Sequence, residues 1–599
     1  MRSIGLFGCW LLAASQLASA NTNPERQTVF SAPHGSTSSS SASSGPRKIA
    51  IIGSGPSGAS AAYWLSRAQQ KLDELGRAEE GFELHLYERE ERIGGRVKVT
   101  YPFDDEEHYE AVELGASIFA EVNKNMERAA KTFRLPMTAH LGEEDSLTGV
   151  WDGQQFVLDD LGGSWWSSAR LFWRYGYSPI TTKNLVTELK DKFLRLYDPA
   201  FLHRPKSANT TESGYPWGSI EKMAKHLNLS DSASADAQSW FYGKGVSQLF
   251  TQELIEAASR VNYGQNTDSI HALGAGVSLA ASGATGIKGG NHRVFEEMIA
   301  RSDARVHLGE HGEVTGLVKY DSKELFQAFA AGQLPGVSES EVTASKDGST
   351  KWWVGTAAGG GGLFDAVFIG TPWHAGGITL LNTEATIPVN KYVHLYVTLL
   401  ATNASHPSAQ YFGRTQGSDV PKAILTTYEA VRKADAPAKP KVDKKWYHFG
   451  HFGSETIAAK RPELEFTSLT YMSTLPARSS SAAQDHLVKI FSLQPLSDEK
   501  LDELIGADTI GWVYRQEWDA YPELHPTTVF PPITPDEGLY YMNAMEPLIS
   551  TMETSTVSSR NAVALALEKW LGLDFVIGTE CDFSTADEES WDGWGCHSG

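Results

Sequence analysis

Residues 48–58 have the sequence Lys48-Ile-Ala-Ile-Ile-Gly-Ser-Gly-Pro-Ser-Gly58, and this stretch decides the fold. Its apolar first half predicts a strand buried on both faces of a parallel sheet, because such strands carry nearly continuous apolar side chains. Gly53, Gly55 and Gly58 follow in the Gly-x-Gly-x-x-Gly spacing of dinucleotide-binding units. We therefore expect a strand, a tight turn and a helix that begins near Pro56.

Each glycine of this turn has its own expected role. Gly53 permits the turn, Gly55 lets the backbone approach a pyrophosphate, and Gly58 lets the helix pack closely on the strand. Pro56 and Ser57 fall in the first helical turn, whose free N–H groups attract phosphate. The alternative is a strand, turn and helix that bind no ligand.

A second apolar strand is expected at residues 82–87, and it ends at Glu88. An acid at this point is the residue type that binds a ribose 2′-hydroxyl in dinucleotide-binding units. Glu88 comes later than usual because the charged segment 71–81 has the character of an insertion. Arg89 follows directly and is included in the candidate site.

The whole chain has 599 residues, 41% of them hydrophobic, which is enough for two to four domains. It carries 52 basic and 73 acidic residues, a formal charge of −21. That charge argues against a nucleic-acid partner, because phosphate backbones bind basic surfaces.

The N-terminus predicts entry into the secretory pathway. Residues 1–20 have one early arginine, an apolar core and the ending Ala18-Ser19-Ala20, which is typical of a signal peptide. Residues 21–46 are rich in Ser, Thr and Pro and are expected to form a disordered linker. No later stretch reaches about 18 apolar residues, so we expect no transmembrane segment and a soluble protein, or one in peripheral contact with lipid.

Cysteines and sequons agree with that route. Cys9 leaves with the signal peptide, so Cys581 and Cys596 remain, either paired as a disulfide or as two free thiols. Candidate glycosylation sites are Asn209, Asn228 and Asn403.

Two later blocks favour a flavin over a nicotinamide. Gly94, Gly95 and Arg96 form a glycine pair with a cation, suited to a loop pressed against a cofactor. Gly115, Ala116 and Ser117 are three small residues, as a flat ring lying on backbone requires. A glycine-pair loop after a nucleotide-binding strand resembles the amine-oxidase-like flavoproteins, and this resemblance implies FAD.

Two further segments are unusual in composition. Trp173, Tyr175 and Tyr177 belong to an aromatic-rich helical segment, read either as ordinary core or as an apolar wall for a long hydrocarbon. Asn262 and Tyr263 lie in the polar-aromatic run Arg260-Val-Asn-Tyr-Gly-Gln265.

Taken in order, these blocks resemble the prenylcysteine oxidase family, also called prenylcysteine lyases, over residues 47–572. The blocks that carry the resemblance are Trp173-Arg-Tyr-Gly-Tyr177, Arg260-Val-Asn-Tyr-Gly-Gln265, Leu539-Tyr-Tyr-Met-Asn543 and Met552-Glu553. The chain departs from the family in having Lys288, where the family has Glu, before the triplet Gly289-Gly290-Asn291.

The resemblance implies an α/β fold with a discontinuous Rossmann-type FAD-binding domain and an inserted α+β substrate-binding domain. Expected boundaries are a signal peptide at 1–20, a linker at 21–46, FAD-binding parts at 47–135, 285–387 and 531–575, substrate-domain parts at 136–284 and 388–530, and an acidic tail at 576–599.

Site residues carried over by motif fall into two groups. Cofactor-binding residues are expected to be Gly53, Gly55, Pro56, Ser57, Gly58, Glu88, Arg89, Gly94, Gly95, Arg96, Gly115, Ala116, Ser117, Val314, Glu546, Met552 and Glu553. The substrate pocket is expected to include Trp173, Tyr175, Tyr177, Asn262 and Tyr263. No metal site is expected.

The implied activity is FAD-dependent oxidation of a prenyl thioether. Farnesylcysteine or geranylgeranylcysteine would react with dioxygen and water to give a prenyl aldehyde, cysteine and hydrogen peroxide, in a vacuole, a lysosome or outside the cell. His394 is the one candidate catalytic residue, positioned to orient water, and the alternative is a buried structural histidine. Two other functions stay open: an amine or other small-molecule oxidase, and a secreted lipid-binding flavoprotein without activity.

Overall fold

A computed structural model describes residues 45–139, 148–159, 165–202, 215–280, 283–344, 350–428, 464–476, 484–578 and 594. The predicted signal peptide, nearly all of the linker, Asn209, Cys581, Cys596 and most of the acidic tail lie outside the described residues.

A five-stranded parallel sheet forms the centre of the nucleotide-binding part. Its strand order is β20-β13-β1-β2-β9, with β1 in the middle. The residues Ile49–Ile52 of β1 are at most 5% exposed, as expected for a strand covered on both faces. The strands are β1 (Arg47–Ile52), β2 (Phe82–Glu88), β9 (Arg305–Leu308), β13 (Ala366–Ile369) and β20 (Leu539–Tyr541).

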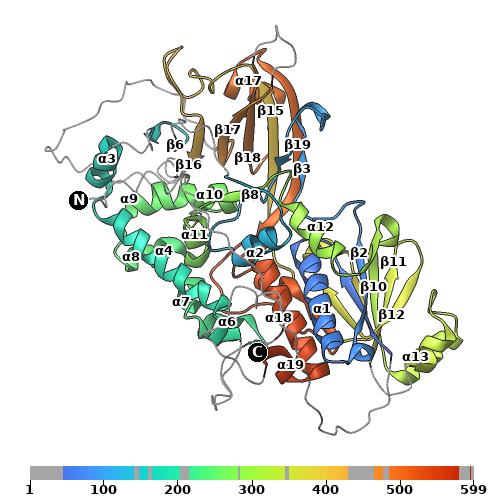
Figure 1. The fold of residues 1–599 in the computed structure, drawn as a ribbon. Helices are drawn as coiled ribbons and strands as arrows, with labels where there is room; N and C mark the ends of the chain where they lie inside the picture. The colour runs from blue at the N-terminus through green and yellow to red at the C-terminus, as the bar shows by residue number, and fades with distance from the viewer. Residues whose placement is uncertain are drawn as a thin grey trace, which may run out of the picture.

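Two long helices, α1 (Pro56–Glu74) and α18 (Met552–Leu571), lie side by side against this sheet, although almost five hundred residues separate them (Figure 1). Helix α12 (His292–Ala300) also packs on α1. Helix α1 extends to Glu74, and a 3-10 turn at Ala78–Glu80 follows it. Of the segment expected to be an insertion, residues 71–74 therefore continue the first helix, and the rest forms the connection to β2, which together explain why Glu88 comes late.

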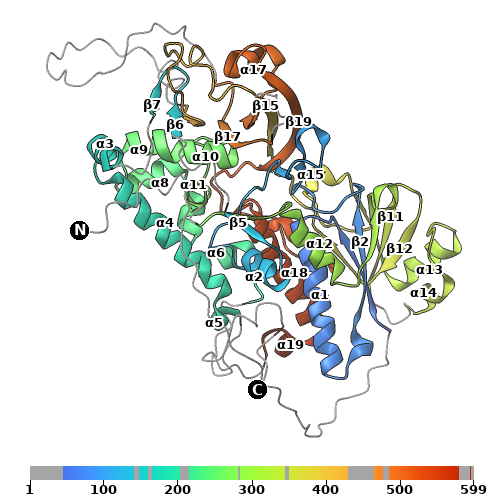
Figure 2. The ribbon, with the colours of Figure 1, turned by 45° about the horizontal axis from the view of Figure 1, so that its top comes forward.

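A smaller sheet with order β12-β11-β10-β14 flanks the first (Figure 2). Helices α13 and α14 lie at its outer side (Figure 2). Its elements are β10 (Val314–Tyr320), β11 (Lys351–Thr356), β12 (Gly361–Phe364), β14 (Thr379–Leu381), α13 (Ser322–Ala330) and α14 (Glu339–Ala344).

A seven-stranded sheet of order β19-β15-β18-β17-β16-β6-β7 forms the second body of the molecule. Strand β15 pairs antiparallel with both β18 and β19, which places it inside this sheet. The elements are β6 (Thr148–Trp151), β7 (Phe156–Leu158), β15 (Tyr392–Thr402), β16 (Ala423–Thr426), β17 (Ser468–Thr474), β18 (His486–Ser492), β19 (Ile510–Pro522) and α17 (Asp498–Ile505).

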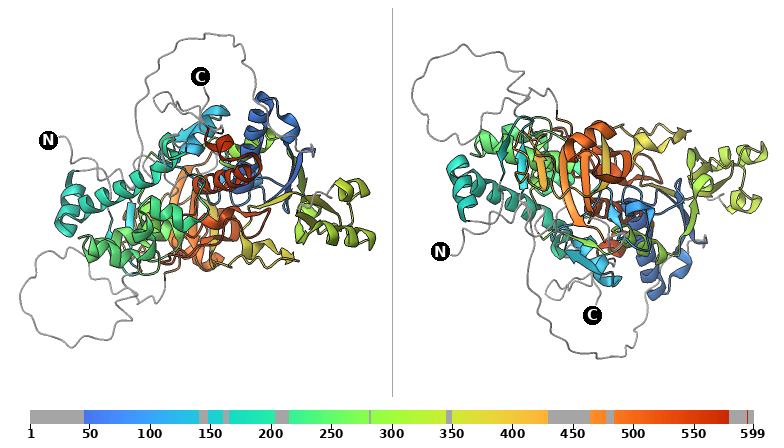
Figure 3. Two further views of the ribbon diagram at one scale, coloured as in Figure 1. Left: turned by 90° about the horizontal axis from the view of Figure 1, so that it is seen from below. Right: turned by 90° about the horizontal axis from the view of Figure 1, so that it is seen from above.

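A helical lobe extends from this sheet and lies opposite α13 and α14 in both views of Figure 3. It consists of α3 (Trp165–Tyr175), α4 (Ser178–Leu194), α5 (Pro199–Leu202), α6 (Ile220–His226), α7 (Ser230–Ser234), α8 (Ala237–Gly243), α9 (Gln248–Phe250), α10 (Glu256–Tyr263) and α11 (Ala272–Ser278). Among the described residues, no helix combines the length and apolar composition needed to cross a bilayer.

Shorter elements complete the described structure. They are the strand pairs β3 (Val99–Thr100) with β4 (Val112–Glu113) and β5 (Met137–Ala139) with β8 (Thr285–Ile287), and the helices α2 (Lys124–Thr132), α15 (Trp373–Gly376) and α19 (Leu573–Ile577). The central parallel sheet takes its strands from distant parts of the chain, and the seven-stranded sheet lies largely between them in sequence. The predicted α/β fold with a discontinuous Rossmann-type domain is therefore confirmed.

Candidate functional site

The turn after β1 has the backbone geometry that its glycines predict. Gly53 has φ +94°, a region that favours glycine, and its N–H donates to the Tyr87 carbonyl at 2.7 Å. A Cβ on Gly58 would lie 1.8 Å from the Gly53 carbonyl oxygen. Glycine at position 58 is therefore required for α1 to pack on β1.

The glycine pair of residues 94 and 95 faces this turn directly. Gly94 and Gly95 have φ +118° and +56°, and the Gly94 N–H donates to the Ser54 carbonyl at 3.2 Å. A Cβ on Gly55 would lie 3.7 Å from Gly95 Cα, between the two loops. Helix α1 starts after Gly55 without a side-chain cap. Bare first-turn amides between two glycine loops fit the pyrophosphate of a dinucleotide.

Glu88 lies at the end of β2, next to the same turn. Its carboxylate is buried, and Oε2 accepts hydrogen bonds from the Ser54 N–H and hydroxyl, both at 2.8 Å. Arg89 is exposed and donates to the Ala375 carbonyl at 2.7 Å. Val314 is buried at the start of β10. Contacts of these three residues with a ribose or adenine stay predictions.

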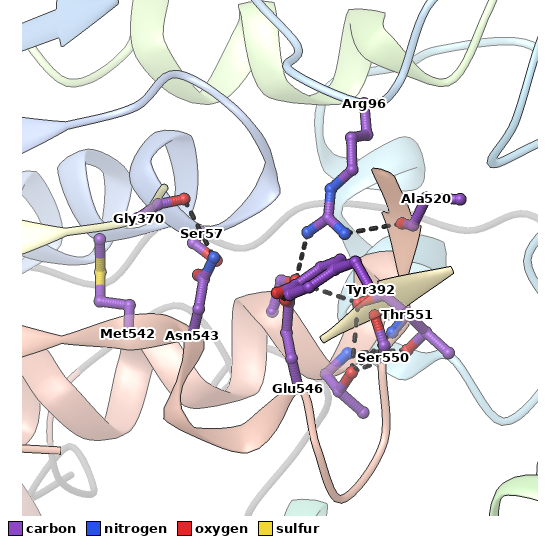
Figure 4. A network of polar contacts seen from close by, with 12 residues as sticks. Ser57, Arg96, Gly370, Tyr392, Ala520, Met542, Asn543, Glu546, Ser550 and Thr551 are labelled. Atoms are coloured by element: carbon purple, nitrogen blue, oxygen red, sulfur yellow. Dashed lines mark hydrogen bonds and ion pairs between the residues drawn. The ribbon is translucent and has the colours of Figure 1, made fainter. Parts of the chain in front are cut away.

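Arg96 takes part in a polar network that joins the two bodies of the molecule. Figure 4 shows its guanidinium between the Ala520 carbonyl, at 2.7 Å, and the Glu546 carboxylate. The Tyr392 hydroxyl donates to the other oxygen of Glu546. Burial and the Glu546 charge both raise the pKa of Tyr392 above its ordinary value, so the phenol stays protonated.

A second set of contacts in Figure 4 ties α1 to the C-terminal part of the chain. The Ser57 hydroxyl donates to Asn543 Oδ1 at 2.8 Å, and Asn543 Nδ2 donates to the Gly370 carbonyl at 3.4 Å. Ser57 is therefore held by a protein side chain, and its backbone N–H belongs to the first turn of α1.

The turn at residues 115–117 is held from several sides. The Ala116 carbonyl accepts from Asn291 Nδ2 at 2.7 Å, and the Ser117 N–H donates to the Gly115 carbonyl at 2.7 Å. A Cβ on Gly115 would come within 2.8 Å of the Trp518 ring. Glycine at position 115 is thus needed for the packing of this turn against Trp518 of β19.

His394 lies on β15, and its side chain is 48% exposed, so it is not a buried core residue. Its Nδ1 is 2.9 Å from Asp519 Oδ1, and the other oxygen of Asp519 is 2.9 Å from His374 Nε2. Burial alone would raise the pKa of Asp519, but the hydrogen bonds of the two histidines hold it below the ordinary value. The His374 ring lies 4.1 Å from the Tyr392 ring, which places this bridge beside the Arg96 network.

Comparison with known proteins now identifies the family. A family model described as "Prenylcysteine lyase" matches residues 158–576, and one described as "NAD(P)-binding Rossmann-like domain" matches residues 51–133. The chain belongs to the prenylcysteine lyase family.

Curated relatives match nearly the whole length. The chain is 29% identical to "Farnesylcysteine lyase" of Arabidopsis thaliana over 572 residues, which cover 92% of each chain. It is 26% identical to "Prenylcysteine oxidase 1" of Homo sapiens, over 88% of this chain and 90% of that protein.

Among solved structures, a triple mutant of putrescine oxidase matches with 11% identity and a TM-score of 0.48, over 88% of this chain and 99% of the other. Cyclohexylamine oxidase from Brevibacterium oxydans matches with 13% identity and a TM-score of 0.46, over 88% and 99%.

The start of α18 carries two of the residues that the family motif suggested. Met552 is nearly buried in its first turn, behind the N-cap Thr551. Glu553 is 1% exposed, and its carboxylate accepts the backbone N–H groups of Asn125 at 2.8 Å and Met126 at 3.0 Å. In this prenylcysteine lyase family member the Glu553 side chain therefore caps α2.

The expected aromatic wall of the substrate pocket needs correction. Trp173 is 92% exposed and Tyr177 is 71% exposed, so these rings lie on the surface of the helical lobe and not in a buried wall. The aromatic composition of the segment predicted burial, but composition does not tell which side of a helix neighbouring elements cover. Tyr175 is buried, and its hydroxyl donates to Glu253 at 2.7 Å.

The polar-aromatic block near residue 262 joins the lobe to the rest of the molecule. Asn262 is exposed, whereas Tyr263 is buried, packs against Tyr521 and donates to the Ser550 carbonyl at 3.2 Å. Ser550 directly precedes the N-cap of α18, so Tyr263 positions the start of that helix. The sequons at Asn228 and Asn403 lie at exposed positions, and their glycosylation stays a prediction.

Several residues of the site carry no local sequence signal. Asp519, His374 and Tyr392 come from β19, α15 and β15, and only the folded chain brings them together. For Asn291 the sequence gives a weak indication, because this residue ends the triplet Gly289-Gly290-Asn291. Its contact with Ala116, 175 residues away, was not foreseeable from that triplet.

Proposed function

We propose that this chain is an FAD-dependent oxidoreductase that cleaves the thioether of farnesylcysteine or geranylgeranylcysteine. One dioxygen and one water would be consumed for each thioether, giving a prenyl aldehyde, free cysteine and hydrogen peroxide. The observation that carries the proposal is the pair of facing glycine loops at Gly55 and Gly95, in a chain of the prenylcysteine lyase family. The family relation supports the substrate class, and the loops support the dinucleotide.

The residues present fit FAD. The N-terminus of α1 and the glycine pair would hold the pyrophosphate, and the 115–117 turn would lie at the ring system. When bound, FAD would take two electrons from the carbon beside sulfur and pass them to dioxygen. Arg96 is already neutralised by Glu546, so it would orient the cofactor through this fixed pair.

The task left to the protein is to place the thioether and one water. Asp519 holds Nδ1 of His394, so Nε2 is the ring atom that would take a proton from the attacking water. A carboxylate on Nδ1 also fixes the ring orientation and stabilises the imidazolium that forms. Water addition and loss of the thiol then yield the aldehyde.

The proposal is tested with purified protein reconstituted with FAD and given farnesylcysteine. Aldehyde, free thiol and peroxide are expected in equal amounts, and a saturated alkyl cysteine thioether of the same length should give none. Peroxide formed only with a polyamine would instead indicate an amine oxidase. Bound flavin without turnover of any of these compounds would indicate a lipid-binding flavoprotein.

A further inference from the structure

Lys489 is a buried cation at the boundary between the two bodies of the molecule. It lies in the middle of β18, is 8% exposed, and its cross-strand neighbours Leu399 and Thr470 are uncharged. Its Nζ donates to the Glu113 carbonyl at 2.7 Å and to the Ser117 hydroxyl at 2.9 Å. The ammonium group therefore reaches from the seven-stranded sheet to the turn that would meet the flavin.

A buried acid, Glu113, lies just before the same turn in the sequence. Glu113 is 6% exposed, and its Oε1 accepts the Asn291 N–H at 2.5 Å. Within the described part of the chain, nothing donates a hydrogen bond to the buried Glu113 Oε2. Asn291 in turn holds the Ala116 carbonyl. Residues 115–117 are thus held by Lys489 directly, through Ser117, and by the Glu113 carboxylate indirectly, through Asn291.

Such a pair is costly for stability. Burying two ionisable groups loses their hydration, and apolar side chains of similar volume often stabilise a fold as well or better. Packing alone therefore does not account for Lys489 and Glu113 at this place. Their position beside the candidate flavin turn points to an electrostatic role.

The pair can change its net charge near neutral pH. Burial raises the pKa of Glu113 to about 7, although the Asn291 N–H and Lys489 oppose this. Burial lowers the pKa of Lys489 to about 8, although Glu113 opposes this. Among the described residues, the charges that shift these two pKa values are those of Glu113 and Lys489 themselves. The pair therefore carries +1 at acidic pH, zero between the two values and −1 at alkaline pH.

We propose that Lys489 and Glu113 set the charge at the flavin edge of the site and thereby tune the reduction potential of the bound flavin. This inference rests on the proposed function, because it takes the cofactor to be FAD. A cation beside the turn stabilises the negative charge that a flavin gains on reduction, and a carboxylate does the opposite. Lys489 is in this sense a positioning residue, since it acts through the 115–117 turn.

The test measures the midpoint potential of bound flavin by equilibration with redox dyes. Lys489→Met at pH 6 is expected to change the ratio of oxidised to reduced flavin at least tenfold toward the oxidised form, which is 29.6 mV for a two-electron couple. Glu113→Gln is expected to shift the ratio in the opposite direction at pH 8.5. It should have little effect at pH 5.5, where the wild-type carboxyl is already protonated. Lys489→Arg should retain the wild-type potential at pH 6.

Lys98→Met is the matched control, because Lys98 also joins the β3 region to the seven-stranded sheet, through Gln516 at 3.0 Å. The midpoint potential of flavin bound to Lys98→Met should equal that of the wild type. Unchanged potentials in Lys489→Met and Glu113→Gln, with only a lower Tm, would leave a purely structural role and overturn the inference. If Lys489→Met does not fold, the midpoint potential of Glu113→Gln at pH 8.5 tests the inference: a shift toward the reduced flavin supports it, and an unchanged potential overturns it. A wild-type chain that takes up no flavin would overturn the proposed function as well.

Discussion

Gly55 and Gly58 are three residues apart, and their side-chain positions have very different surroundings. The Cβ position of Gly58 falls 1.8 Å from the Gly53 carbonyl oxygen, inside the fold. The Cβ position of Gly55 makes only ordinary contacts, and its φ of −70° suits any residue. Gly55 therefore leaves space that a ligand can use, whereas Gly58 is required for the close packing of α1 on β1.

Gly55→Val is accordingly expected to fold but to lose the cofactor. The added side chain fills the space between the two glycine loops, so the purified protein should be colourless, with a far-UV CD spectrum equal to that of the wild-type apoprotein. Gly58→Val should prevent folding, because it forces α1 away from β1. A large loss of soluble protein is expected. Yellow Gly55→Val protein would show that the cofactor lies elsewhere.

His394 and Asp519 form the candidate water-activating pair. His394→Ala is expected to lower the rate of aldehyde formation by about 10²- to 10⁴-fold, the usual contribution of a general base. Asp519→Asn should lower it less and alter its dependence on pH. Flavin content should not change in either variant, which visible absorbance would show.

His108→Ala provides the control for that pair. His108 contacts Asp105 at 2.9 Å, a similar pairing, but its side chain is 72% exposed. Its loss should leave turnover unchanged. Wild-type turnover in His394→Ala would reject the catalytic assignment and make the pair a contact between β15 and β19.

At the scale of elements, Glu553 joins two helices by their N-termini. It lies in the first turn of α18 and accepts the N–H groups of Asn125 and Met126 in the first turn of α2. Burial raises the pKa of Glu553 to about 7, and these hydrogen bonds oppose the rise. The Tyr197 hydroxyl donates to the same carboxylate. The start of α18 is therefore fixed in space by α2, as well as by its own N-cap.

Glu553→Gln should destabilise the fold by about 1–3 kcal/mol, because one amide of α2 loses its acceptor in a buried site. Thermal unfolding followed by CD measures this as a lower Tm. The control is Glu127→Gln in α2, where the carboxylate forms surface ion pairs with Lys124 and Lys131. Glu127→Gln should change the free energy of unfolding by no more than about 0.5 kcal/mol. Equal Tm values for the two variants would contradict the capping role.

Elements whose causes are local could be predicted from the sequence. The strand, the glycine turn and the helix that begins at Pro56 follow from an apolar run and the glycine spacing, although the helix continues to Glu74, beyond the expected insertion point. Contacts between distant strands could not be predicted, because they depend on register. In the sequence, nothing distinguishes Lys489 from other strand residues. Its contact with the 115–117 turn becomes visible only in the folded chain. Trp173 was placed in a pocket for a different reason: aromatic composition does not show which side of a helix is covered, and its ring is 92% exposed.

Across the whole molecule, the site is assembled from both bodies. Tyr392 on β15 binds Glu546 after β20, and Arg96 binds both Glu546 and the Ala520 carbonyl of β19. A cofactor that binds along this boundary stabilises both bodies at once, since any ligand of the native state adds to its stability. The two bodies are therefore coupled through the site itself.

Trp594, in the C-terminal tail, makes a similar link for the nucleotide-binding part. Trp594 is 2% exposed, and its indole N–H donates to the Trp64 carbonyl at 3.0 Å. The Arg560 guanidinium lies over both rings, 5.0 Å from Trp64 and 5.3 Å from Trp594. One aromatic residue thus closes over α1 and α18, the two helices that support the glycine turn.

Trp594→Ala is therefore expected to lower the free energy of unfolding by about 3 kcal/mol, in the range for a buried Trp replaced by Ala. Because Arg560 would lose one face of its stacking, the apoprotein and the FAD-bound protein should both melt at lower temperature. Trp173→Ala is the matched control, since that ring is 92% exposed and its removal should change stability by less than about 0.5 kcal/mol. If both variants have the Tm of the wild type, Trp594 does not hold α1 and α18 together. If Trp173→Ala is the less stable of the two, the exposed face of α3 is covered in solution.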